Sequence, residues 1–101
     1  MKKIVYASLL VALSMTAAAD TEGLAALRAA AERGQIDAQY ELGVLYEFGY
    51  RFPEHKVTAF AWYSRAAEQG SAAAAKRRDL LEMELSAAER ERARALVKTR
   101  R

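Results

Sequence analysis

The sequence predicts an all-α fold made of short helices arranged in pairs. A five-residue phrase, AAERG, begins at Ala30 and returns as AAEQG at Ala66, 36 residues later. Each copy ends in glycine, the residue that adopts the left-handed conformation closing a helix without a Cβ penalty. Self-similarity at this period is typical of helix-pair repeats. No segment shows the apolar alternation of a β-strand.

The first 19 residues have the pattern of an export signal. Lys2 and Lys3 precede an apolar stretch from residue 4 to residue 15, and small residues at positions 17–19 suit signal peptidase. The stretch is short for a membrane span, which needs about 20 residues. We therefore expect cleavage after Ala19, no stable membrane insertion, and a periplasmic or secreted protein. A membrane anchor or a buried N-terminal helix is the alternative.

The remaining chain, residues 20–101, has the length of one small domain. The formal net charge falls from +3 to +1 once the two signal lysines are removed. A nearly neutral exported chain is a poor candidate for nucleic-acid binding. The chain has no cysteine, so it forms no disulfide and carries no lipid-modified cysteine.

Five helices are expected, and their boundaries follow from capping residues. Gly34 and Gly70 end the first and third helices, while Asp37, Ser71 and Ser86 are N-cap candidates. Ser86 is followed three residues later by a glutamate, which is the spacing of a capping box. A loop at residues 49–55 contains the only proline. The predicted helices cover residues 22–33, 38–48, 56–69, 72–84 and 87–98.

The pattern across the middle of the chain resembles the Sel-1-like repeat family, an α/α solenoid related to tetratricopeptide repeats. The residues that match its signature are Ala38, Gln39, Leu42, Gly43, Tyr46, Gly49, Ala59, Trp62, Tyr63, Ala66, Ala67 and Gly70. The resemblance implies a short α/α superhelix used as a protein-interaction scaffold. It divides the domain into a partial repeat at 22–34, a full repeat at 35–70 and a degenerate capping repeat at 71–98.

Glycine 43 lies within a predicted helix, where glycine costs about 1 kcal/mol relative to alanine. Close approach of the partner helix would offset that cost. Two positions depart from the family pattern, because Arg51 replaces a loop glycine and His55 replaces an aspartate before the next helix. In the closing repeat the charged residues 77–79 replace the equivalents of residues 41–43, which we interpret as the polar outer face of a terminal cap.

Catalytic and metal-binding residues are not evident. His55 is the only histidine and there is no cysteine, so a zinc site of ordinary composition is not expected. Ser71 and Ser86 are explained as helix caps, which leaves no activated serine near His55. The sequence therefore predicts a non-enzymatic protein without cofactor or metal.

Eight aromatic residues fall between positions 40 and 63. Tyr46, Phe60 and Trp62 are expected in the core. Exposed aromatic residues often anchor protein interfaces, although they also fill out small cores. The residues predicted to contact a partner are Tyr40, Val44, Glu47, Tyr50, Phe52 and His55.

The C-terminal third is basic, with 9 basic and 5 acidic residues from position 76 to position 101. This excess could attract an anionic partner or membrane surface. A solvated capping helix with basic residues at its C-terminal end explains it as well, and we favour that interpretation.

Together these features predict an exported adaptor that binds another protein, or a peptide segment, in the groove of its helix pairs. The alternative is an inhibitor or immunity-like protein that neutralises a periplasmic enzyme or toxin. A cell-wall-associated enzyme is a third class. A stable solenoid usually needs about three repeats. Because this chain has one full and two partial repeats, self-association into a homo-oligomer is a further possibility.

Overall fold

The computed structural model describes residues 22–49 and 53–99, and this part of the chain is helical with short turns and no strand. The all-α prediction is confirmed. A first helical segment covers residues 22–32. The elements that follow are α2 (Ile36–Val44), the π-helix η1 (Leu45–Gly49), α3 (His55–Glu68), α4 (Ala72–Glu82) and α5 (Ala87–Thr99). The predicted signal at 1–19 and the loop positions Tyr50, Arg51 and Phe52 lie outside the described residues.

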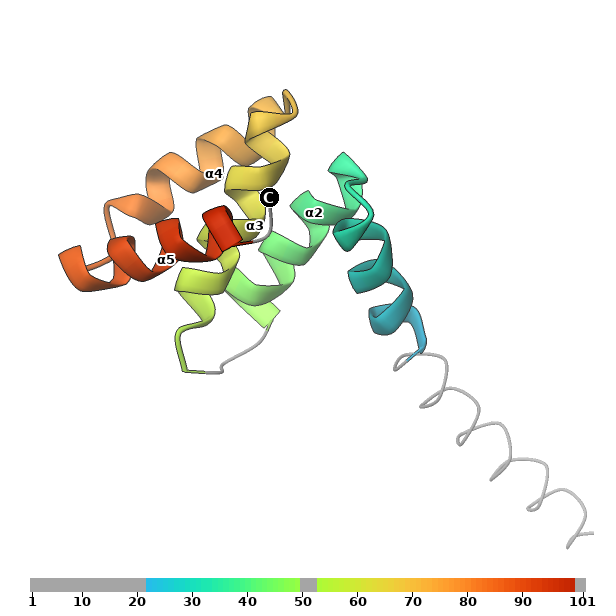
Figure 1. Ribbon diagram of the computed structural model, residues 1–101, viewed down its shortest axis with the longest axis horizontal. Coiled ribbons are helices and arrows are strands. Elements are labelled where there is room, and N and C mark those ends of the chain that lie inside the picture. Colours follow the sequence, from blue (N-terminus) through green and yellow to red (C-terminus); the bar gives the residue numbers. More distant parts are fainter. Residues whose placement is uncertain (1–21, 50–52, 100–101) are drawn as a thin grey trace, which may run out of the picture.

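Helix α3 is the central element of the described part. The elements α2, η1, α4 and α5 all pack against it, and α2 also contacts α4. Figure 1 shows the blue segment 22–32 and green α2 on one side of α3, and orange α4 and red α5 on the other. Helix α5 therefore packs on α3, the second element before it in the chain.

The repeated phrase folds the same way in both copies. Gly34 has a φ of 95° and Gly70 a φ of 106°, both in the left-handed region. In each copy the amide after the glycine donates to the carbonyl of the alanine that opens the phrase, at 3.1 Å in the first copy and 3.0 Å in the second. This is the Schellman motif, which satisfies carbonyls left open at a helix end. The prediction that both glycines close helices is confirmed.

The start of α2 differs from the prediction. The helix begins at Ile36, with Gln35 at the N-cap position and no side-chain cap hydrogen bond. Asp37 lies within the first turn, where its charge is favourable near the positive helix end, but it is not the cap. The Schellman motif at Gly34 already turns the chain into the next helix. Helix α2 therefore starts one residue before Asp37, the predicted N-cap.

The second difference lies between residues 45 and 49. An α-helix was expected to continue to residue 48, but α2 ends at Val44 and a π-helix follows. Periodicity alone does not distinguish these two geometries over five residues. Single π-helical turns are rare and often occur at functional positions.

The serine caps are confirmed. The hydroxyl of Ser71 accepts a hydrogen bond from the Ala74 amide at 3.1 Å. Ser86 and Glu89 form the predicted capping box, in which the Ser86 amide donates to the Glu89 carboxylate at 2.8 Å and the Glu89 amide donates to the Ser86 hydroxyl at 3.1 Å. Helix α3 lacks such a cap. Glu54 is at its N-cap position with a left-handed φ of 62°, and the Glu54 side chain makes no cap hydrogen bond.

The core consists of two buried clusters. One joins α3 to α4 and α5 and contains Val57, Ala59, Phe60, Tyr63, Ala66, Ala74, Leu81, Leu85 and Ala93. The other joins the segment 22–32 to α2 and α3 and contains Ala31, Ala38, Leu42 and Trp62. Phe60 and Trp62 are buried as predicted, and Tyr46 is half-buried between the two clusters.

Candidate functional site

Gly43 on α2 packs directly against Tyr63 on α3. A Cβ atom at this position would lie 2.6 Å from two ring atoms of Tyr63, whose side chain is fully buried. No residue with a side chain fits there unless the helices move apart. The prediction that glycine permits close helix packing at this point is confirmed.

Behind this contact lies a buried polar cluster formed by Glu47, Tyr63 and Arg77. The Tyr63 hydroxyl donates to the Glu47 carboxylate at 2.8 Å. Arg77 donates to both oxygens of the same carboxylate, at 3.2 and 2.5 Å. The Glu47 side chain is 5% exposed, so this bidentate pair is largely removed from water. The cluster connects η1, α3 and α4.

The cluster shifts the titration of two of its members. Burial raises the pKa of Tyr63 well above its usual range, and the hydrogen bond to the Glu47 carboxylate adds to this effect. The hydrogen bond from Arg77 to Glu47 raises the pKa of the guanidinium, which keeps it charged. Both shifts favour the protonated donors that the carboxylate requires.

Arg77 therefore differs from its predicted role. We expected residues 77–79 to form the polar outer face of a terminal cap, but Arg77 reaches inward to Glu47 and also lies 5.2 Å from the ring centroid of Phe48. Arg78 pairs with the neighbouring Asp79 at the surface, as a solvated cap would. The correction is confined to Arg77.

A second polar link was not predicted. Gln39 is almost fully buried, and its amide donates to the Ala31 carbonyl at 3.1 Å while its oxygen accepts from Gln69 at 2.8 Å. Ala31 and Gln69 belong to the two copies of the repeated phrase. The only sequence signal was a polar residue on the buried face of the predicted helix.

On the outer side of α2, a shallow hollow of about 430 Å³ is lined by Tyr40, Glu41, Val44 and Leu45. Tyr40 and Val44 are half-buried and pack against the core. The Tyr40 ring lies 5.8 Å from the ring of Tyr63. Tyr40 thus packs against the core through Tyr63, and the rest of its surface lines the hollow.

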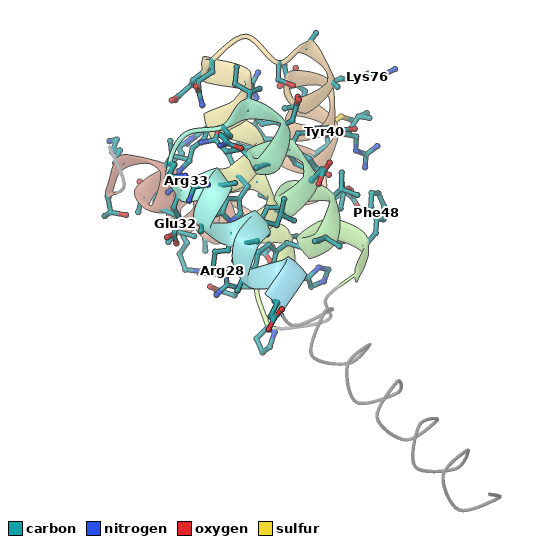
Figure 2. The ribbon with its side chains drawn as sticks, turned by 90° about the vertical axis from the view of Figure 1, so that its right-hand side faces the viewer. Arg28, Glu32, Arg33, Tyr40, Phe48 and Lys76 are labelled. Atoms are coloured by element: carbon teal, nitrogen blue, oxygen red, sulfur yellow. The ribbon has the colours of Figure 1, made fainter. Side chains whose placement is uncertain are left out.

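Three large apolar side chains outside this hollow are exposed. Phe48 is 66% exposed, Leu80 is 44% exposed and Met83 is 82% exposed. Residues 76 and 80 of α4 and the C-cap residue 83 share one side of this helix, because they are spaced by four and three. Figure 2 shows Tyr40, Phe48 and Lys76 toward the same side of the molecule, with Arg28, Glu32 and Arg33 toward the other. We name as the α2–α4 face the set of Tyr40, Val44, Phe48, Lys76, Leu80 and Met83.

The predicted contact residues have different positions. Tyr40 and Val44 lie together on the α2–α4 face, whereas Glu47 is inside the molecule and its carboxylate is used by Tyr63 and Arg77. His55 is half-buried, and its Nδ1 lies 2.9 Å from the Tyr46 carbonyl. A carbonyl only accepts, so Nδ1 carries the proton. The predicted contacts at positions 50 and 52 lie outside the described residues.

Residues 22–49 and 53–99 contain no group of three or more His, Asp or Glu side chains placed to hold a metal ion. None of the helices in these ranges is both long enough and apolar enough to cross a membrane.

Comparison with known proteins gave no relatives. The chain matches no protein-family model, no curated protein and no solved structure.

Proposed function

We propose that the protein is a non-enzymatic interaction module that binds another protein through the α2–α4 face. The observation that carries this proposal is the exposure of Phe48 in η1, Leu80 in α4 and Met83 at the C-terminal end of α4. Helix α4 reaches η1 here, since the Arg77 guanidinium lies 5.2 Å from the centroid of the Phe48 ring. Among the described residues, Leu96 is the one other large apolar side chain with comparable exposure. Clustered apolar exposure marks interaction surfaces more often than scattered apolar residues do.

The repeat organisation supports the same surface. Tyr40 and Lys76 are 36 residues apart, as are Val44 and Leu80. The period of the repeated phrase thus relates the α2 half of the face to the α4 half. We interpret the domain as a short solenoid of the Sel-1-like type, in which equivalent helices present equivalent positions to a ligand.

The charges on this face indicate the chemistry of the partner. Lys76 on α4 and Glu41 in the hollow make no ion pair within the described part of the chain. A segment with apolar side chains for Phe48 and Leu80 and a carboxylate near Lys76 would complement it. A basic side chain in the same segment would complement Glu41. The proposed ligand is therefore an amphipathic segment of mixed charge.

Selection from a displayed library of random peptides tests this proposal. The expected result is enrichment of peptides that bind residues 20–101 and lose affinity for the triple variant Phe48→Gln/Leu80→Gln/Met83→Gln. All three side chains are exposed, so the variant is expected to keep its helix content. Circular dichroism checks that point.

The matched control is Leu96→Gln, which removes a comparably exposed apolar side chain from α5. Selected peptides should bind this control as they bind the original chain. Peptides that bind the triple variant equally well, or a selection that enriches none, would reject the α2–α4 face as the binding surface.

The site of action is part of the proposal. The signal-like pattern of residues 1–19 supports export to the periplasm or beyond. The mass of the protein purified from its native compartment should correspond to residues 20–101. A mass that includes the first 19 residues would contradict cleavage.

A further inference from the structure

The basic residues of α4 and α5 do not all behave as a solvated surface. Arg77 is committed to Glu47, and Arg92 forms an ion pair with Glu54. Three other cations converge on one hollow, which lies between α3, α4 and α5 and is lined by Phe60, Ser64, Glu68, Arg78, Arg94, Val97 and Lys98. The basic excess of the C-terminal third is thus partly concentrated at one place.

The hollow has a volume of about 250 Å³ and an apolar floor. Phe60 and Val97 form the floor, and both are buried. The Ser64 hydroxyl donates to the Phe60 carbonyl at 2.8 Å, so its proton is not available to a ligand. Glu68 is the one acidic residue in the lining, which carries a formal net charge of +2.

The acidic partners of these cations lie outside the lining. Arg78 pairs with Asp79 at 3.1 Å, while Arg94 lies 3.5 Å from Glu82 and 3.8 Å from Glu91. Ion pairs between exposed side chains contribute little, because water and salt screen them and the side chains must be ordered. A ligand anion can therefore replace them at small cost.

Lys98 strengthens the case because it has no ion-pair partner within residues 22–49 and 53–99. Its ammonium group and the two guanidinium groups can surround an oxyanion with charge-assisted hydrogen bonds. The volume is below that of sites for drug-sized ligands. It suits one terminal group rather than an entire large molecule.

We infer that this hollow, the α3–α5 pocket, binds an oxyanion attached to a small apolar group. The anionic head meets Arg78, Arg94 and Lys98, and the apolar part rests on Phe60 and Val97. A carboxylate and a phosphate ester share this chemistry. The site is separate from the α2–α4 face, since residue 78 is displaced by about 200° from residue 76 around α4. It is therefore a second binding site, independent of the proposed function.

Titration followed by backbone amide NMR shifts tests the inference. The probes are inorganic phosphate, phenyl phosphate, acetate and benzoate, each added at constant ionic strength near neutral pH. We expect saturable shifts at Ser64 and Val97, with phenyl phosphate or benzoate binding more tightly than the corresponding ion without a ring. The double variant Arg94→Gln/Lys98→Gln should weaken binding at least about 10-fold, since charge-assisted contacts are lost.

The matched control is Arg33→Gln/Arg92→Gln, which removes the same charge from exposed positions outside the pocket and outside the α2–α4 face. It should leave the affinity unchanged. Binding confined to the phosphates or to the carboxylates supports the site and identifies the head group. Non-saturable shifts, or equal losses in the two double variants, would overturn the inference. Peptide binding by the α2–α4 face should be unaffected by Arg94→Gln/Lys98→Gln, so the two proposals fail separately.

Discussion

The two sides of α3 are held by different kinds of contact. On the side of α2 and η1, which we call the first junction, Gly43 meets a tyrosine ring and Glu47 and Gln39 are buried with their hydrogen bonds satisfied. On the side of α4 and α5, the closing pair, the buried residues are apolar except Ser64, whose hydroxyl is used within α3, and the ion pairs lie at the surface. Arg77 is the exception, because it extends from the closing pair into the first junction.

This difference indicates which contacts require particular residue types. At the first junction each partner must be one residue type, since a directional hydrogen bond or the absence of a Cβ defines the contact. In the closing pair the requirement is apolar volume, which several residues can supply. The first junction should therefore be much less tolerant of conservative substitution.

The largest effect is expected for Gly43→Ala. The added methyl group would overlap the Tyr63 ring, which is buried and held by its hydrogen bond to Glu47, so the two helices must separate. We expect a loss of about 3 kcal/mol in the free energy of unfolding, measured by urea denaturation. Gly23→Ala is the control, because no atom lies within 4 Å of its Cβ position. Equal effects of the two substitutions would contradict the close packing.

Arg77→Met should follow, with a loss of about 2 kcal/mol, because Glu47 keeps a buried charge with only Tyr63 to satisfy it. The double variant Glu47→Gln/Arg77→Met should recover part of this loss, since the unpaired charge is gone. Arg92→Met breaks the exposed pair with Glu54 and should cost no more than about 0.5 kcal/mol. A similar cost for both arginine variants would show that burial of the Glu47 pair has no consequence.

Tyr63→Phe isolates one hydrogen bond of the same cluster. Loss of a hydrogen bond to a charged group should cost about 1.5 kcal/mol in the free energy of unfolding. The pH dependence is a second readout. The folded protein holds the pKa of Tyr63 above its usual range, so its contribution is complete below the unfolded pKa of about 10 and declines at higher pH. As the pH rises above about 10, the free energy of unfolding should therefore fall less in Tyr63→Phe than in the original chain.

Leu81→Met probes the closing pair, where Leu81 is fully buried on α4. Methionine keeps the volume, so the expected loss is about 1 kcal/mol or less. Thermal unfolding by circular dichroism measures it beside Gly43→Ala. A loss as large as that of Gly43→Ala would remove the contrast between the two sides of α3.

The smallest effect concerns the start of α5. The Ser86 amide donates to the Glu89 carboxylate and thereby lowers the pKa of Glu89. A lowered folded pKa gives stability that is present above the unfolded pKa, about 4.3, and is lost as the pH falls through the folded value. The stability difference between the original chain and Glu89→Gln should therefore shrink in acid. A difference that grows as the pH falls would contradict the capping box.

The local features of the fold were predictable from the sequence. The glycines of the repeated phrase and the capping box at Ser86 are encoded within a few residues, and the structure has both. Apolar spacing gave five helices whose ends are within a few residues of the observed ones. These features depend on the chain's own neighbours, so a single sequence contains the information.

The polar contacts of the first junction were not predictable. Glu47 and Arg77 are 30 residues apart, and nothing local distinguishes a buried glutamate from an exposed one. Glu47 is among the residues predicted to contact a partner, but it is buried and bound by Tyr63 and Arg77. The π-helical turn and the link between Gln39 and Gln69 likewise depend on how helices pack. Of the predicted contact residues in the described ranges, Tyr40 and Val44 are carried into the proposed face.

Met83 gives the α2–α4 face a chemical vulnerability. It is the only methionine after the predicted cleavage site and the most exposed of the large apolar side chains described. Oxidation would turn its thioether into a polar sulfoxide within the proposed apolar contact surface. If the α2–α4 face binds a partner as proposed, peroxide would weaken that binding without unfolding the domain, and a methionine sulfoxide reductase would restore it.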